Sequence, residues 1–175
     1  MGGVSLGVDI GNVIINHRSV NHADSTLFDY RYSTIPATPD VYSSLKALNN
    51  GPFDGRIFLI SKCTDTAECK ILTWLKDNDF YGKTNINPKN VFFVKDRIGK
   101  AEVCIEHRIT HFIDDRLEVL SAMIGKVPNL FLYQPDVEEV KRYAKYLPNV
   151  IVVDSWKDFY AKVTPQPDIT RHCQY

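Results

Sequence analysis

Short runs of β-branched and aromatic residues alternate with amphipathic stretches along most of the chain. Such apolar runs predict buried β-strands, whereas apolar residues spaced three and four apart predict helices. The expected strands cover residues 4–8, 56–60, 91–94, 111–113, 130–133 and 150–153. The expected helices cover residues 41–48, 66–78, 100–107, 117–124, 137–145 and 156–163.

Strands that are apolar throughout and alternate with helices are typical of a parallel sheet that is buried on both faces. We therefore expect an α/β fold: a Rossmann-like, doubly wound, mainly parallel sheet with helices on both faces. Ligands bind such sheets beyond the carboxyl ends of the strands. The polar residues at these ends are therefore candidates for function, namely Asp9, Ser61, Lys95, Asp114 and Asp115.

The 175 residues suffice for one domain with a single core. We expect this domain to cover residues 1–163 and residues 164–175 to form a poorly ordered tail. Polar, aromatic and proline residues interrupt the pattern at residues 16–40. A long segment directly after a first strand is more often a functional loop than a chance insertion.

Composition narrows the class of protein. With 21 basic and 21 acidic residues the chain has no basic excess, so we expect neither a nucleic-acid partner nor a membrane surface. The four cysteines form no C-x-x-C pair, which argues against a disulfide framework or a zinc site and favours a reducing cytosol. Neither a signal-peptide pattern nor an apolar stretch of roughly 20 residues occurs, so the expected location is cytoplasmic.

Asp9 raises the first question about chemistry. It ends an apolar run and is followed by Gly11 and a second apolar run. An acid at this place either caps the following turn or acts as a reactive carboxylate. Motifs farther along the chain favour the second interpretation.

Four short motifs follow one another at the ends of the expected strands. They are V-D-I-G-N-V-I at 8–14, F-L-I-S-K at 58–62, a lysine near a helix start, and H-F-I-D-D-R at 111–116. Together they resemble the motifs of the haloacid dehalogenase (HAD) superfamily, which is dominated by phosphatases. The resemblance covers residues 4 to about 121 in the family's order. One such motif alone is weak, because a hydrophobic run ending in an acid is common, whereas four in order are more specific.

The resemblance implies a phosphomonoester hydrolase with a catalytic aspartate. Asp9 matches the nucleophile that forms an aspartyl-phosphate, and Ser61 matches the hydroxyl that hydrogen-bonds a phosphoryl oxygen. Taken alone, a serine at such a place is more often an ordinary loop hydroxyl. Lys100 and Lys95 compete for the lysine that neutralises charge on the nucleophile and phosphate. Lys100 is preferred, because the family places this lysine near the start of such a helix.

The resemblance also implies Mg²⁺ as the cofactor. Asp114 and Asp115 match the acidic motif that holds this hard cation, which prefers oxygen ligands. Asp9 and the Gly11 carbonyl would complete the metal site. The alternative is that the acids cap the following helix, Asp115 especially, because negative charge is favourable at a helix start.

Asn12 and Lys62 are further candidates for substrate binding. A helix that begins near either residue would offer backbone N–H groups to a phosphate. Asn12 is also a common turn residue. The resemblance thus implies a phosphorylated substrate, either a small molecule or a macromolecule.

Gly11 departs from the commonest first motif of the family, which has a second aspartate there as general acid/base. Glycine keeps the carbonyl for the metal but removes the proton donor. The chain is then a phosphatase in which water, the substrate or a nearby group such as His17 or His22 supplies the proton, or a relative with different chemistry and a larger cap. The other alternative is a catalytically weak or inactive relative that binds phosphate or a phosphoprotein.

The family's cap domain is expected to be minimal here. Residues 16–40 are too few for a helical cap, and one helix, a loop and a strand account for residues 62–99. Members without a cap tend to accept bulky substrates or to close their sites by forming homo-oligomers. Phe28, Tyr30 and Tyr32 are expected to line the open mouth of the site.

Overall fold

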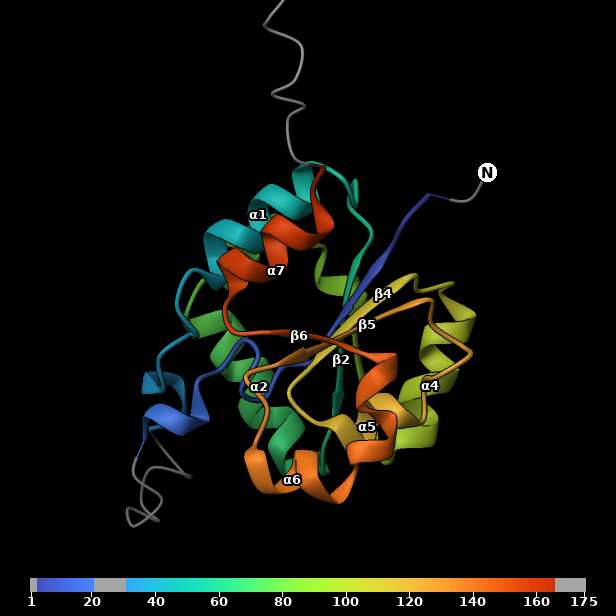
Figure 1. The fold of residues 1–175 in the computed structure, drawn as a ribbon. Coiled ribbons are helices and arrows are strands. Elements are labelled where there is room, and N and C mark those ends of the chain that lie inside the picture. Colours follow the sequence, from blue (N-terminus) through green and yellow to red (C-terminus); the bar gives the residue numbers. More distant parts are fainter. Residues whose placement is uncertain (1–2, 21–30, 166–175) are drawn as a thin grey trace, which may run out of the picture.

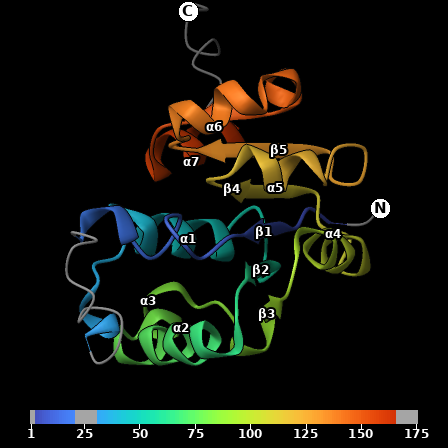
Figure 2. The same ribbon diagram turned by 90° about the horizontal axis from the view of Figure 1, so that it is seen from below.

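The computed structural model describes residues 3–20 and 31–165. These residues form a six-stranded sheet with the order β3-β2-β1-β4-β5-β6, in which all neighbouring strands are parallel. Figure 2 shows this order, with β3 at the lower edge and β5 toward the upper one. The strands are β1 (Leu6–Val8), β2 (Ile57–Lys62), β3 (Val91–Val94), β4 (His111–Asp114), β5 (Asn129–Tyr133) and β6 (Ile151–Val153).

Helices cover both faces of the sheet, as the apolar strands predict (Figure 1). One buried cluster, which includes Trp74 and Trp156, fills one face, and a second cluster around Cys104 and Leu120 fills the other. The helices on the first face are α1 (Val41–Asn50), α2 (Asp65–Asp77), α3 (Phe80–Thr84) and α7 (Trp156–Val163). Those on the second face are α4 (Arg97–Glu106), α5 (Leu117–Ser121) and α6 (Val137–Arg142).

The strand order reverses between β1 and β4. The chain first builds the sheet from β1 through β2 to β3, then crosses by α4 on the opposite face and returns to β4 beside β1. Val8 pairs with Ile113 in this register, so Asp9, which follows β1, comes level with Asp114 at the end of β4. In doubly wound sheets the crevice beyond such a pair of strand ends is where ligands bind.

Most elements differ from the predicted bounds by one to three residues at an end, and two of these differences concern candidate residues. Helix α4 begins at Arg97 rather than at Lys100, because Asp96 accepts a hydrogen bond from the Gly99 backbone N–H at 2.8 Å and caps the helix earlier. Lys100 therefore lies within the first turn instead of opening the helix. Strand β2 continues to Lys62, since its last residues pair with β3, and Ser61 lies inside the strand.

The prediction for residues 62–99 was incomplete. Besides α2 and β3 this span contains α3 and the 3-10 helix η4 (Pro88–Asn90). Asp79 adopts a left-handed conformation with φ of 50° and separates α2 from α3, whose Phe80 is fully buried. A helix of five residues is too short to show a periodic apolar pattern.

A minimal cap is consistent with the parts of the chain that the structure describes. Between β1 and β2 these residues add only the 3-10 helices η1 (His17–Ser19) and η3 (Tyr32–Thr34) before α1. Three residues singled out in the sequence, His22, Phe28 and Tyr30, lie outside the described residues, as does 166–175 of the expected tail. Among the described helices, none combines the length and the apolar character needed to cross a membrane.

Candidate active site

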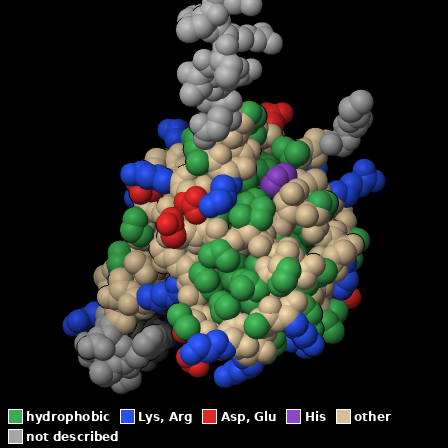
Figure 3. All heavy atoms as spheres, in the orientation of Figure 1, with side chains coloured by type: hydrophobic (Ala, Val, Ile, Leu, Met, Phe, Trp, Pro, Cys, Tyr) green, Lys and Arg blue, Asp and Glu red, His purple; other side chains and the backbone are tan. Residues whose placement is uncertain are grey.

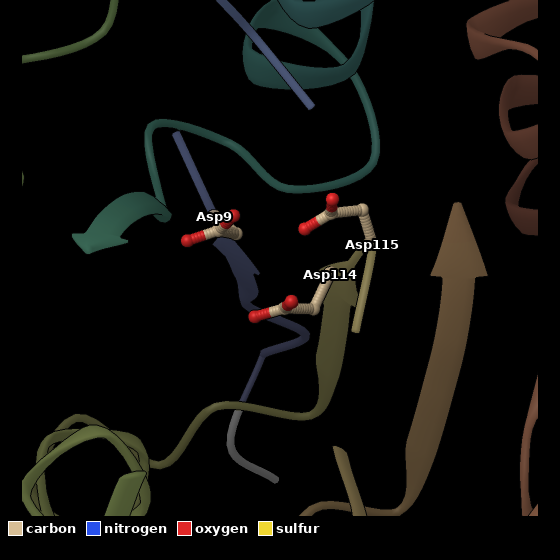
Figure 4. Close-up of side chains that lie close together, drawn as sticks. All are labelled: Asp9, Asp114 and Asp115. Atoms are coloured by element: carbon tan, nitrogen blue, oxygen red, sulfur yellow. The ribbon is translucent and has the colours of Figure 1, made fainter. Parts of the chain in front are cut away.

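Three buried carboxylates meet beyond the ends of β1 and β4. Asp9 directly follows β1, Asp114 ends β4 and Asp115 comes next (Figure 4). Their exposed fractions are 8%, 1% and 7%, and one oxygen from each lies within 4.8 Å of the others. Burying several acids together is unfavourable unless a cation compensates their charge.

Lys100 supplies part of that compensation from the first turn of α4. Its Nζ donates hydrogen bonds to Asp9 Oδ1 at 2.6 Å and to Asp114 Oδ2 at 2.7 Å, and the residue is 1% exposed. Lys95 instead pairs with Asp65, and both side chains are exposed. Of the two lysines left open by the sequence, the structure thus brings Lys100 to the carboxylates.

One lysine does not balance three acids, and the pKa values reflect this excess. Burial, then repulsion from Asp114, raises the pKa of Asp9 far above its ordinary value, although Lys100 opposes the shift. The same two causes raise the pKa of Asp115 to about 6. Burial lowers the pKa of Lys100, but the charges of Asp114 and Asp9 outweigh it and raise the pKa, so this lysine is charged.

Neither Asp9 nor Asp115 acts as a cap. Within the described residues, the Asp9 carboxylate accepts from Lys100 and from no backbone N–H of the following turn. The N-cap residue of α5 is Arg116, without a side-chain cap bond, so the structure does not bear out the alternative in which Asp115 caps this helix. Asp114 does accept from the Arg116 N–H at 3.0 Å, in addition to binding Lys100.

Asp115 is held by two donors that reach the same oxygen. Asn12 Nδ2 and Arg18 Nη2 each lie 3.1 Å from Asp115 Oδ2, and Arg18 Nη1 also donates to the Gln134 carbonyl at 2.7 Å. Arg18 was not a candidate from the sequence, because no local pattern marks it. Its contacts depend on the tertiary structure, because Asp115 follows β4 and Gln134 follows the neighbouring strand β5.

The segment after Asp9 is a tight turn, and the helix start expected near Asn12 is not formed. Asn12 has a φ of 61°, which asparagine tolerates, and its N–H donates to the Ile15 carbonyl at 2.8 Å. Asn12 Oδ1 is buried and has no hydrogen-bond partner among the described residues. The helix near Lys62 is present: α2 begins at Asp65, with Thr64 as its N-cap residue.

Gly11 stands in this turn with space beside it. A Cβ built at Gly11 would meet His17 as its nearest neighbour, at 3.8 Å, which is ordinary van der Waals contact. The position therefore accommodates a Cβ, and close packing does not require glycine there. The nearest atoms to such a Cβ belong to the imidazole of His17.

Eight of the candidate residues for catalysis, substrate binding and metal binding line one cavity of about 170 Å³, whereas Lys95 and His17 do not line it. Ser61 reaches it from inside β2 and is 4% exposed, while Lys62 reaches it from the last position of the strand. The candidates that share this cavity are Asp9, Gly11, Asn12, Ser61, Lys62, Lys100, Asp114 and Asp115.

Comparison with known proteins identifies the fold. No model of a protein family matches the chain, and no curated protein sequence matches it significantly. A HAD family hydrolase from Deinococcus radiodurans R1, solved with bound phosphate and sodium, superposes with a TM-score of 0.65 at 10% identity over 92% of this chain and 95% of that chain.

Two phosphatases give similar results. D,D-heptose 1,7-bisphosphate phosphatase from B. bronchiseptica, complexed with magnesium and phosphate, has a TM-score of 0.63 at 10% identity and covers 91% of this chain and 98% of its own. Phosphoserine phosphatase in its apo form has a TM-score of 0.56 at 12% identity. The match covers 94% of this chain and 100% of that chain. The protein therefore has the HAD-like α/β fold, as the four motifs predicted.

Proposed function

We propose that this protein is a Mg²⁺-dependent phosphomonoester hydrolase that forms an aspartyl-phosphate on Asp9. The observation that carries the proposal is the buried cluster of Asp9, Asp114 and Asp115 around Lys100, in one cavity with Ser61. Phosphoryl transfer relies on positioning and on charge neutralisation around the transferring oxygens. A carboxylate nucleophile is suitable because the acyl phosphate that it forms is readily hydrolysed.

The residues present fit a magnesium ion. Three buried carboxylates share one lysine, and all the available ligands are oxygen atoms, which suits a hard cation. Asp9, Asp114, Asp115 and the Gly11 carbonyl would hold the ion. When bound, it would neutralise charge on the phosphoryl oxygens. The magnesium and phosphate in the similar heptose bisphosphate phosphatase support this proposal.

Each side chain then has a defined part in the reaction. The Asp9 carboxylate attacks phosphorus, the P–O bond to the leaving group breaks, and water later hydrolyses the acyl phosphate and restores Asp9. Ser61 and Lys100 hold the phosphoryl oxygens, and Asn12 and Lys62, which line the same cavity, contact the phosphate. Arg18 keeps Asp115 oriented through one of its two oxygens.

The leaving group needs a proton that Gly11 does not supply. His17 supplies the nearest atoms to a Cβ built at position 11. Water, the substrate or His17 is therefore the proposed proton donor. If none of them donates, the same cavity still binds phosphate, and the protein is a phosphate- or phosphoprotein-binding module. Gly11 is the observation that favours this second function.

Hydrolysis of a broad panel of phosphomonoesters by the wild type, Asp9→Asn and Gly11→Asp distinguishes the two functions. Turnover by the wild type that requires both Mg²⁺ and Asp9 would support the phosphatase. The Cβ of a Gly11→Asp variant would meet no atom closer than 3.8 Å, so the substitution creates no clash at Cβ. An inert wild type together with an active Gly11→Asp variant would support the binding module.

We also propose a cytosolic location. Of the cysteines in the described residues, Cys63, Cys69 and Cys104 are all free thiols. Free thiols persist in reducing compartments. Localisation of a tagged full-length chain by microscopy tests this proposal.

A further inference from the structure

The side chain of Asn12 connects the turn after β1 to the acids of the site. Its backbone is held in this turn, because the Asn12 N–H donates to the Ile15 carbonyl at 2.8 Å. Its amide Nδ2 donates to Asp115 Oδ2 at 3.1 Å. A carboxylate oxygen accepts hydrogen bonds but cannot donate one, so the NH₂ end of the amide must face Asp115. The orientation of Oδ1 is thereby fixed as well.

The amide oxygen of Asn12 is buried and accepts no hydrogen bond within the described residues. Charged side chains at the surface, such as those that Figure 3 shows in blue and red, are solvated by water. A buried acceptor without a partner instead costs free energy, and buried polar groups in proteins are nearly always hydrogen-bonded. Asn12 Oδ1 is thus placed to accept a hydrogen bond from a donor that enters the site.

The donor belongs to the cavity that contains Asp9, since Asn12 lines this cavity together with the three carboxylates. Phosphate itself is a poor partner for Oδ1, because a phosphate group is mostly dianionic at pH 7 and its oxygens are acceptors. The contact with phosphate proposed for Asn12 therefore falls to the second hydrogen of Nδ2. A different group of the loaded site must donate to Oδ1.

The proposed metal supplies such a donor through a bound water. Mg²⁺ takes octahedral coordination and usually keeps water among its ligands. Octahedral coordination offers one position more than Asp9, Asp114, Asp115, the Gly11 carbonyl and a phosphoryl oxygen fill. A water at this position carries hydrogens that need acceptors.

The carboxylates have few oxygens left to accept from this water. Lys100 already donates to Asp9 Oδ1 and Asp114 Oδ2, and the Arg116 N–H donates to Asp114 Oδ1. Asp115 Oδ2 accepts from Asn12 itself. The amide oxygen of Asn12 is a neutral acceptor in the same cavity that is not in use within the described chain.

We propose that Asn12 is a positioning residue of the metal site: its Oδ1 accepts a hydrogen bond from the water that remains on the metal, while its Nδ2 holds the ligand Asp115. The inference rests on the proposed Mg²⁺-dependent function and adds a residue to it. One side chain then orients both a carboxylate ligand and a water. Groups that orient metal ligands in this way strengthen metal binding and restrict the geometry of the site.

The test uses the full chain with Mn²⁺ in place of Mg²⁺, because both ions suit octahedral oxygen sites and Mn²⁺ is paramagnetic. Magnetic relaxation of water nuclei, measured with inorganic phosphate present, gives the number and the lifetime of the waters on the ion. Asn12→Gly removes the amide without straining the backbone, since φ at this position is 61°. We expect the bound water to exchange about three- to tenfold faster in this variant, as for the loss of one hydrogen bond.

Arg18→Ala is the matched control. Arg18 Nη2 donates to the same oxygen of Asp115, also at 3.1 Å, but a guanidinium has no acceptor to offer a water. Its loss should weaken Mn²⁺ binding without shortening the lifetime of the bound water. Asn12→Asp is the second variant, because aspartate tolerates the left-handed conformation and keeps an oxygen acceptor but loses the donor to Asp115. Here the water should exchange no faster than in the wild type.

Equal water lifetimes in the wild type and Asn12→Gly would overturn the inference while the metal site stands. So would equally fast exchange in Asn12→Gly and either Arg18→Ala or Asn12→Asp. A crystal structure with Mg²⁺ and phosphate gives a direct check, and it contradicts the inference if Asn12 Oδ1 lies farther than about 3.2 Å from every water on the ion. Absence of Mn²⁺ binding by the wild type would instead refute the proposed metal site itself, and this inference with it.

Discussion

The ammonium group of Lys100 lies 2.6 Å from Asp9 Oδ1, although the two residues are 91 positions apart in the sequence. The same group lies 2.7 Å from Asp114 Oδ2, so one buried cation joins the acids of two neighbouring strands. Removing one partner of a buried ion pair leaves the other charge uncompensated, which is more destabilising than losing a surface pair. Lys100 therefore connects the two strand ends and supplies the positive charge between the acids.

Replacing this lysine tests its structural part. Lys100→Met should lower the free energy of unfolding by about 3–5 kcal/mol without Mg²⁺, because Asp9 and Asp114 then stay buried without their cation. Denaturant unfolding followed by circular dichroism measures the change. Lys95→Met is the control and should unfold like the wild type, since Lys95 pairs with Asp65 at the surface. Equal stabilities of the two variants would contradict the proposed link.

Asp9→Asn should separate stability from activity. Burial and the nearby charge of Asp114 raise the pKa of Asp9, so its ionised form is unfavourable in the folded protein. Asparagine removes that charge, and we expect a Tm at pH 7.5 without Mg²⁺ that is equal to or a few degrees above that of the wild type. Turnover should be abolished, and Mg²⁺ should no longer raise the Tm. Thermal scans with and without Mg²⁺ give both readouts, and a large drop in Tm would show that Asp9 is mainly structural.

Magnesium affinity should fall as the pH is lowered. The pKa of Asp9 is raised, and burial with repulsion from Asp114 raises the pKa of Asp115 to about 6. A carboxyl group with a raised pKa is protonated at a higher pH than usual, and it must lose this proton before it binds the cation. Between pH 8 and pH 5.5 the apparent Kd for Mg²⁺ should therefore rise by about tenfold or more. Calorimetry in buffers of different ionisation enthalpy should also detect proton release, and a constant Kd would contradict the proposed ligands.

Arg18 should affect the Mg²⁺ affinity indirectly, by orienting the ligand Asp115. It donates to Asp115 Oδ2 and to the Gln134 carbonyl, and this leaves Asp115 Oδ1 for the cation. Arg18→Ala should weaken Mg²⁺ binding about tenfold, as is typical when a residue that orients a metal ligand is lost. Arg142→Ala removes an equal charge from the same side of the site and serves as the control. Mg²⁺ titrations that give the same Kd for both variants would argue that Arg18 acts only through its overall charge.

The chain's local pattern was sufficient to predict all six strands of the sheet and most of the helices. Strand β3 (Val91–Val94) and helix α7 (Trp156–Val163) have the predicted bounds, because an apolar run and a helical stripe are both encoded in neighbouring residues. The strand-end acids Asp9 and Asp114 and the HAD-like fold also followed from the sequence, since short motifs keep their order along the chain. The short helix α3 and the early start of α4 did not, because single caps and left-handed residues decide such boundaries.

The sequence by itself thus determined the α/β class, the candidate acids and the absence of an acid at position 11. Only the tertiary structure decided which distant side chains meet: it placed Lys100 rather than Lys95 between the acids and brought Arg18 to Asp115. It also turned the Asn12 amide nitrogen toward Asp115. The physical reason is that hydrophobic periodicity is a local property of the chain. The neighbours of a strand end, in contrast, depend on the order in which all the strands pack, and here that order places β1 beside β4.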